Sequence, residues 1–358
     1  MGSGGFNLIG TGVREGGALW PLALALSGIL MMCSSFTYAD AFARFRKDTS
    51  ESDSIREAFG SVAEMAGSFG IVFYHLASIV VILVICANMI LPNGSWAAQV
   101  GLTLSALAGM SAVALCGIDL DKQIINTVSW VLIGVLGFSA VLGLWGIREP
   151  IPVFHQKPNF LTSILMFFFV LAGFDTIMKF AEETKDDADI PRAFYVSNAI
   201  SILLTAGVAI AIMYWVPVNQ QGEGAMATLL ATFLGAWALK PIRWAIVAFL
   251  LLTTFVIFLA TSRYLYSFGA DSWLQATNEA QAPWAAIATV FGSGSLLALI
   301  NNTQQLVIIT DVGFAVIASL VASSIAVANW NDENLGAAAL SGTTAAGFVG
   351  LIAAAVSI

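Results

Sequence analysis

Hydrophobic residues in this chain occur in long unbroken runs, and polar residues are confined to the short intervals between them. Four runs are especially clean, each with about 17–24 residues and few or no charges: 18–37, 68–91, 128–146 and 244–260. A helix rising 1.5 Å per residue needs about 20 such residues to cross the hydrocarbon core of a bilayer. A transmembrane barrel strand would alternate apolar and polar residues over about ten positions. The pattern therefore predicts membrane-spanning α-helices.

The same pattern extends along the whole chain and predicts about eleven hydrophobic segments. The first is short, over residues 6–13, and the others run over 17–38, 66–91, 98–117, 125–146, 160–183, 194–216, 242–262, 284–300, 304–329 and 336–357. A further apolar stretch, 226–239, is too short for a full crossing and is predicted to be a re-entrant or surface helix.

Composition strengthens this picture and excludes other classes of protein. Hydrophobic residues make up 58% of the 358 residues and charged residues 10%, with a mean hydropathy of +0.87. Soluble domains average about 45–50% apolar and about 25% charged. The net charge of −8 argues against a nucleic-acid partner. Three scattered cysteines and two histidines indicate no metal site, and no catalytic constellation points to an enzyme.

Lysine and arginine in the short loops predict the orientation of the chain in the membrane. One set of loops carries eight of them: Arg44, Arg46, Lys47, Arg56, Lys122, Lys185, Arg192 and Arg263. The opposite set carries five: Arg14, Arg148, Lys157, Lys240 and Arg243. The first set is therefore expected to face the cytoplasm. Tryptophans near predicted helix ends, including Trp20, Trp96, Trp244, Trp284 and Trp330, are expected to anchor the helices at the membrane interface.

Two glycine-containing segments interrupt the pattern of plain spanning helices. One is the glycine-rich start of the chain, with Gly2, Ser3 and Gly4, and the other surrounds Gly173. Glycine permits unwinding, and unwound backbone within a membrane must line a cavity or be buried in protein. Alternatively, the first segment is a flexible start or linker and Gly173 a tight helix contact. Four hydrophobic segments follow each interruption, an arrangement that favours an inverted-repeat transporter.

Charged residues near the second interruption support this interpretation. Asp175, Lys179 and Glu183 are spaced i, i+4 and i+8, which places them on one face of an α-helix. A charge in the bilayer centre is costly, so Asp175 is predicted to face a pocket or gate, whereas Lys179 and Glu183 could also reach cytoplasmic water. His75 is either a proton-relay residue or a packed histidine. Asp311 is expected just inside a helix end, where hydration is easy.

Four short motifs resemble the amino acid–polyamine–organocation superfamily of transporters. They lie in family order and comprise Met1 to Phe6, the stretch Tyr38-Ala39-Asp40-Ala41-Phe42-Ala43-Arg44, the set Gly173-Phe174-Asp175 with Ala181-Glu182-Glu183 and Asp189-Ile190-Pro191-Arg192-Ala193, and Thr261-Ser262-Arg263-Tyr264-Leu265-Tyr266. The resemblance implies an all-α polytopic membrane protein with a leucine-transporter-like five-plus-five inverted-repeat bundle. It further implies one transporter domain over 1–358, with a first repeat over about 1–146, a second over about 159–330 and an extra helix over about 336–357.

The resemblance also implies a binding site for an amino acid. Backbone N–H groups of Ser3 and Gly4, with Gly2, would bind the substrate carboxylate, as helix N-termini bind anions. Carbonyls of Phe169 and Ala172, beside the Gly173 break, would accept its ammonium group. Phe169 would also be an aromatic lid over the site. The gating or proton-coupling residues would be Asp175 and Lys179.

Two departures from the family pattern qualify this expectation. The first helix is expected to lack its cytoplasmic half, and a twelfth helix is absent from the pattern. The leading hypothesis is a secondary transporter of amino acids that works by alternating access, as a proton symporter or an exchanger, in the plasma membrane. No cofactor is expected, and the coupling ion, H⁺ or Na⁺, stays open. The alternative is a non-transporting protein on the same fold that binds or senses amino acids.

Overall fold

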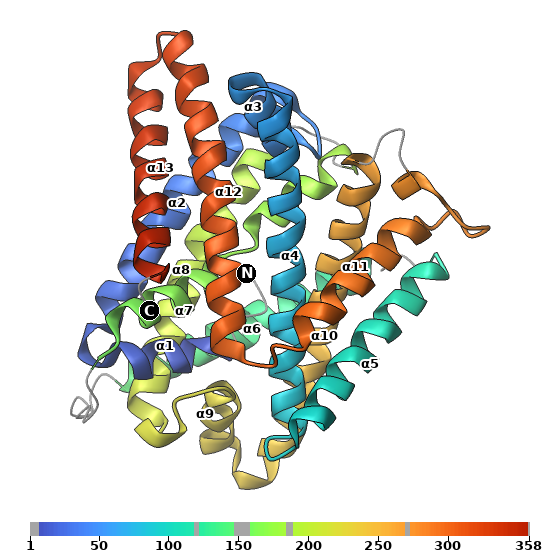
Figure 1. The fold of residues 1–358 in the computed structure, drawn as a ribbon. Helices are drawn as coiled ribbons and strands as arrows, with labels where there is room; N and C mark the ends of the chain where they lie inside the picture. Colours follow the sequence, from blue (N-terminus) through green and yellow to red (C-terminus); the bar gives the residue numbers. More distant parts are fainter. Residues whose placement is uncertain (1–6, 118–121, 147–157, 184–188, 269–272, 357–358) are drawn as a thin grey trace.

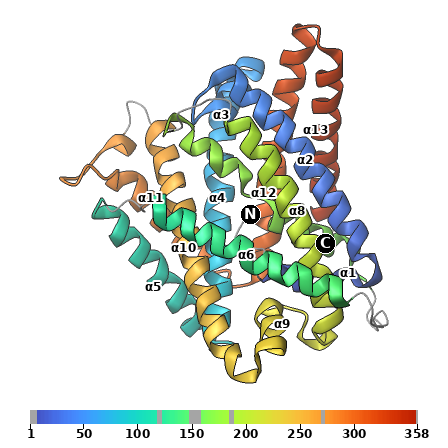
Figure 2. The same ribbon diagram turned by 180° about the vertical axis from the view of Figure 1, so that it is seen from behind.

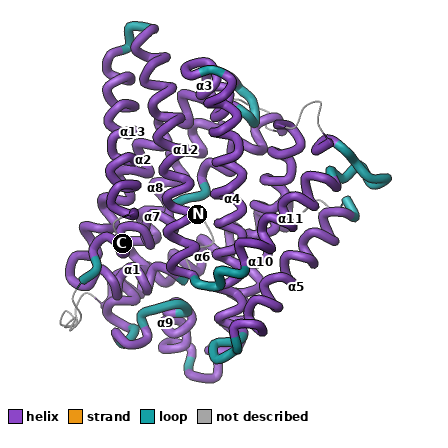
Figure 3. Tube along the Cα trace, viewed as in Figure 1, coloured by secondary structure: helices purple, strands orange, loops and turns teal. Residues whose placement is uncertain are grey.

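A computed structural model of the chain describes residues 7–117, 122–146, 158–183, 189–268 and 273–356. Within these ranges the chain consists of helices joined by loops, with no strand (Figure 3). Eight helical stretches of the described chain are long and apolar enough to cross a membrane. Three shorter apolar helices lie among them, over Ser129–Trp145, Ala225–Leu234 and Trp284–Ala298. The prediction of an all-α polytopic membrane protein is confirmed.

The helices follow one another in the order that the hydrophobic segments predict. The first half contains α1 (Leu8–Gly16), η2 (Gly17–Leu19), α2 (Trp20–Phe45), α3 (Ser50–Phe59), α4 (Ser61–Ile90), α5 (Trp96–Leu115) and α6 (Lys122–Gly146). The second half contains α7 (Phe160–Leu171), η3 (Phe174–Glu183), α8 (Asp189–Trp215), η4 (Val218–Gln220), α9 (Ala225–Leu234), η5 (Ala236–Ala238), α10 (Leu239–Phe268), η6 (Trp273–Gln275), α11 (Trp284–Ala298), α12 (Thr303–Asn331) and α13 (Leu335–Val356).

Helix α4 forms the centre of the bundle. Its most apolar 18-residue window is 78% buried, the highest fraction among the candidate spans. It packs against α3, α5, α10, α11 and α12. In Figure 1, α12 and α13 stand together on one side of α4, and α5 and α11 lie on the other. Figure 2 shows α6, α8 and α10 on the opposite face of the bundle. A helix that is apolar on all sides is suited to this central position.

Side-chain caps fix the starts of three helices. The side chain of Ser95 accepts a hydrogen bond from the Ala98 N–H at the start of α5. Asn159 and Asn302 cap α7 and α12 in the same way. Such caps satisfy N–H groups that have no partner inside the helix. All three lie at the end of the bundle opposite the arginine-rich α2–α3 connection. The charge rule predicts that this end faces outward, and the two ends are named extracellular and cytoplasmic on that expectation.

A polar network joins the cytoplasmic ends of α2 and α12. The Arg44 guanidinium donates to Asn329 Oδ1 at 2.9 Å and lies 2.9 Å from Asp332 Oδ2. Asn329 in turn donates to Asp40 Oδ2 at 2.7 Å. Asp40 and Arg44 belong to the second of the family-like motifs, and the network gives this motif a structural role in holding two spans together.

Two features of the helices differ from the sequence-based predictions. The interval between the second and third hydrophobic segments contains a helix, α3, in which Glu51 and Ile55 are fully buried. Its sequence is polar, so hydropathy did not predict it, and it is buried because it packs against α2, α4 and α12. The anchoring role predicted for Trp20 is wrong, because this side chain is only 5% exposed and its Nε1–H donates to Met213 Sδ at 3.2 Å.

Candidate functional site

The chain unwinds between α7 and η3, at Ala172 and Gly173. Helix α7 ends at Leu171, where the Ala172 N–H still donates to the Phe168 carbonyl at 3.0 Å. Gly173 has a φ of +103°, in the region that favours glycine. The interruption removes the N–H groups that a continuing helix would offer to the carbonyls after Phe168. Carbonyl groups of α7 and the N-terminal end of η3 therefore meet at one place within the membrane-spanning segment.

A small cavity lies beside this interruption. Its volume is about 40 Å³, far below the roughly 300–1,000 Å³ of typical ligand pockets. Five elements line it, namely α4, the end of α7, η3, α10 and α12, through Tyr74, His75, Ser78, Ile82, Phe169, Ala172, Gly173, Asp175, Thr176, Ile257, Thr310, Asp311 and Phe314. The cavity could hold roughly three water molecules, so a larger ligand requires the surrounding helices to move.

Asp175 is the centre of a polar cluster at this cavity. Its side chain is fully buried, and the Tyr74 hydroxyl donates a short hydrogen bond to its Oδ2. His75 Nε2 lies 3.3 Å from the same oxygen and 3.1 Å from the Tyr74 hydroxyl oxygen. The other oxygen, Oδ1, has no hydrogen-bond partner among the described residues. His75 is thus in contact with a buried carboxylate, the arrangement that a proton relay requires.

Lys179 points away from this cluster, although it follows Asp175 by four residues. The prediction that Asp175 and Lys179 share one helix face is wrong, because η3 is a 3₁₀ helix with three residues per turn. Four residues then correspond to about 480° of rotation, so the two side chains diverge by about 120°. The Lys179 ammonium binds Glu51 Oε2 of α3 at 2.8 Å. Both side chains are buried.

Helix α3 closes the bundle on the cytoplasmic side of the site through this ion pair and its surroundings. The Tyr264 ring of α10 lies under the Lys179 ammonium, 4.2 Å from Nζ to the ring centroid. The Tyr264 hydroxyl is 3.2 Å from the hydroxyls of Ser52 and Ser68. Four elements, α3, α4, η3 and α10, therefore meet around one buried ion pair. Removing either partner would leave the other charge buried without a counter-charge, which is strongly unfavourable.

A second cavity, of about 310 Å³, lies on the extracellular side of the site. Its lining includes Arg14 and Glu15 of α1, Met166 of α7 and Thr303 of α12. Met166 precedes Phe169, which lines the inner cavity, by three residues, or about 4.5 Å of helix. The two cavities therefore contact neighbouring parts of α7, less than one helical turn apart along its axis.

The structure brings together four of the residues that the sequence analysis singled out. Phe169, Ala172, Gly173 and Asp175 all line the inner cavity. Lys179 does not line it. Gly2, Ser3 and Gly4 lie outside the described residues.

Sequence reasoning missed three polar contributors. Glu51 and Tyr74 gave no signal, because their partners lie more than 100 residues away in the chain. Asp311 was expected to be hydrated near a helix end. That expectation is wrong, because Asp311 is 1% exposed and lines the inner cavity. It lies eight residues into α12, about 12 Å from the start of the helix.

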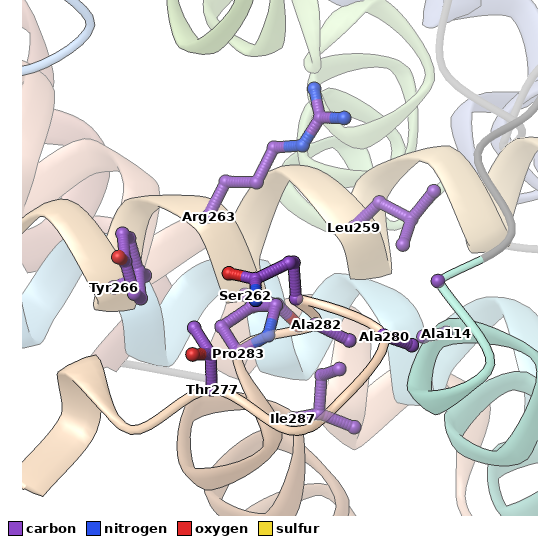
Figure 4. A pocket seen from close by; sticks show the side chains of 12 residues that line it. Ala114, Leu259, Ser262, Arg263, Tyr266, Thr277, Ala280, Ala282, Pro283 and Ile287 are labelled. Carbon is purple, nitrogen blue, oxygen red and sulfur yellow. The ribbon is translucent and has the colours of Figure 1, made fainter.

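A larger cavity, of about 380 Å³, shares no lining residue with this site (Figure 4). It is formed by the ends of α5 and α10 and the loop before α11, and Arg263 is its one charged lining residue in the described chain. None of the predicted site residues contributes to it. The interruption, the buried carboxylate and the inner cavity therefore mark the candidate substrate site.

An interrupted helix beside a cavity, within a bundle of apolar spans, is typical of membrane transporters with an inverted-repeat architecture. The chain is similar to the crystal structure of MhsT in complex with L-phenylalanine, with a TM-score of 0.65 and 13% sequence identity over 99% of this chain and 96% of that one. This likeness shows that the fold is of the leucine-transporter type. No curated protein matches the sequence significantly.

The amino acid permease family matches residues 1–358 of the sequence. The chain belongs to this family. The protein is therefore an integral membrane protein of a transporter family and not an enzyme, and amino-acid transport is the activity that the family and the fold support.

Proposed function

We propose that the protein is a secondary active transporter that carries amino acids by alternating access, as a proton symporter or an exchanger. The observation that carries this proposal is the interruption at Ala172 and Gly173 beside a cavity that contains the buried Asp175 cluster. Unwound backbone within a membrane is stable only where it is buried or lines a cavity. Here it supplies polar groups for a ligand without a buried side-chain charge.

The proposed substrate geometry uses the backbone charges of the interruption. The carbonyls of Phe169 and Ala172 would accept the ammonium group of the substrate, since a helix C-terminus carries partial negative charge. Phe169, which lines the inner cavity, would act as the lid over the substrate. The backbone N–H groups of Ser3 and Gly4, with Gly2, would bind the carboxylate. L-Phenylalanine in the similar structure of MhsT is in keeping with an amino acid as substrate.

The small volume of the cavity is in keeping with an occluded intermediate of alternating access. In this proposal Phe169 forms the barrier on the extracellular side, and the buried Glu51–Lys179 pair forms the barrier on the cytoplasmic side. Transport then requires each barrier to open in turn. Asp175, with Tyr74 and His75, is the proposed place where a proton is taken up or released during this cycle.

Replacement of Gly173 by alanine tests the proposal with the smallest possible change. A Cβ at φ +103° is strained, by about 1–3 kcal/mol, so the interruption should shift and uptake of radiolabelled amino acids into proteoliposomes should fall at least tenfold. The matched control is Gly342→Ala in α13, where a Cβ meets open space. This variant should transport as the unmodified protein does.

Three outcomes distinguish the possibilities. Uptake that depends on Gly173 and not on Gly342 supports the proposal. Amino-acid binding by the unmodified protein with neither uptake nor exchange would show a binding or sensing protein instead. A complete panel of amino acids with no binding and no flux would refute the assignment of this substrate class.

A further inference from the structure

The inner cavity contains a second buried carboxylate that the proposed transport cycle does not use. Asp311 of α12 lines the cavity and is 1% exposed. Neither of its carboxylate oxygens has a hydrogen-bond partner among the described residues. A buried polar group without a partner is strongly unfavourable, and a carboxylate more so. This side chain is therefore placed where a ligand can complete its interactions.

The rest of the lining leaves the cavity negative in character. Besides Asp311, the titratable lining residues are Asp175 of η3 and Tyr74 and His75 of α4. The nearby Lys179 does not line the cavity, and its ammonium is bound to Glu51 at 2.8 Å. No lysine or arginine is thus present in the described lining to neutralise Asp311. The chemistry that complements this site is a positive charge.

The surroundings favour an organic cation over a metal ion. The aromatic rings of Tyr74, Phe169 and Phe314 line the same cavity, and aromatic faces attract ammonium and guanidinium groups. Ile82 and Ile257 add apolar surface that suits the methylene stem of a basic side chain. Within the described residues, no group of three His, Cys, Asp or Glu side chains could hold a metal ion.

We propose that Asp311 determines substrate specificity by binding the positively charged side chain of a basic amino acid, such as lysine or ornithine. The inference rests on the proposed transport of amino acids. The substrate's α-ammonium would bind the carbonyls at the Gly173 interruption, and its side-chain ammonium would bind Asp311 on α12. Because the cavity of about 40 Å³ is too small for such a ligand, binding must accompany movement of the helices that line it.

A comparison of L-lysine binding with L-norleucine binding tests this assignment directly, because the two amino acids differ by the terminal ammonium group. Binding of each is measured by isothermal titration calorimetry on the full chain in detergent, independently of flux. The unmodified protein should bind lysine about tenfold more tightly or better, a difference of about 1.4 kcal/mol. Asp311→Asn should reduce this preference to near unity while norleucine binding is retained. Asp311→Glu should keep it.

Control variants and other cations complete the test. Asp332→Asn removes an exposed carboxylate at the cytoplasmic end of α12 and should leave the preference unchanged. Norleucine bound as tightly as lysine by the unmodified protein, or a lysine preference that survives in Asp311→Asn, would overturn the proposal. The proposal would also be overturned if binding required sodium and if Asp311→Asn abolished that requirement while lysine was still preferred. Loss of norleucine binding in both Asp311 variants would assign the residue a structural role and likewise refute it.

The result also separates this inference from the proposed function. If neutral amino acids are transported and lysine is not, the specificity assignment fails and the transport assignment stands. If lysine binds through Asp311 and no flux occurs, the transport assignment fails and the subsite stands.

Discussion

The buried pair of Glu51 and Lys179 offers the sharpest test of how the cytoplasmic side is closed. The pair joins α3 to η3 with a 2.8 Å contact, and its two side chains are 0% and 1% exposed. Replacing Lys179 by methionine keeps most of the side-chain volume and removes the charge. Glu51 is then left buried without a counter-charge, and its second oxygen already has no partner among the described residues.

The expected magnitude follows from the burial of the pair. Removing one partner of a buried ion pair costs about 3–5 kcal/mol, whereas replacing both with apolar residues of similar size is often neutral or stabilising. With an unfolding entropy of about 2.1 cal/mol/K per residue, 358 residues convert this loss into a decrease of roughly 4–7 °C in Tm. The double variant, Glu51→Leu with Lys179→Met, should unfold within about 2 °C of the unmodified protein.

Thermal unfolding in detergent, followed by tryptophan fluorescence, measures all four members of this double-mutant cycle. Arg14→Met is the control, because its pair with Glu15 is 35% and 26% exposed and such pairs contribute at most about 1 kcal/mol. The reasoning is refuted if the double variant is as unstable as Lys179→Met, since the loss would then come from packing and not from an uncompensated charge. It is equally refuted if Lys179→Met unfolds at the same temperature as the unmodified protein.

Three further predictions address other parts of the molecule. Tyr74→Phe removes the hydroxyl that donates to Asp175. This variant should destabilise the protein by about 1.5–3 kcal/mol and slow amino-acid uptake into proteoliposomes. Unchanged uptake would exclude a role for this hydrogen bond in the transport cycle. Arg44→Ala breaks the network between α2 and α12 and should lower stability by up to about 1 kcal/mol, with a smaller loss at 1 M salt; a loss independent of salt would contradict the electrostatic origin. Gly143→Leu on α6 should prevent stable folding, because even a Cβ at this position would lie 2.4 Å from a backbone oxygen of α8. Gly137→Leu on the same helix meets open space and should be tolerated. Expression and gel-filtration profiles of the two variants check this, and equal behaviour would argue against close α6–α8 packing.

Parts of the candidate site were predictable because their signals are local. The break at Gly173 was predicted from glycine beside an intramembrane acid, and the structure places a positive φ there. The grouping of Phe169, Ala172 and Asp175 followed from their closeness in sequence. The prediction failed where geometry depended on helix type, because an i, i+4 spacing shares a face in an α-helix and not in the 3₁₀ helix of η3.

The partners of these residues were not predictable, because they come from distant parts of the chain. Tyr74 and His75 reach Asp175 from α4, about 100 positions earlier. Glu51 reaches Lys179 from a polar helix that hydropathy gives no reason to bury. Asp311 looks like a solvated residue near a helix start until α4, α10 and η3 enclose it.

The sequence by itself therefore determined that lipid surrounds the protein, the order of its apolar helices and the place where one of them is interrupted. These properties depend on apolar run length and on glycine, which act over neighbouring residues. Only the tertiary structure decided which charges are paired, which carboxylate lacks a partner and which helix closes the site. Those properties arise from the packing of segments that lie far apart in the chain, and burial then determines the energetic importance of each charge.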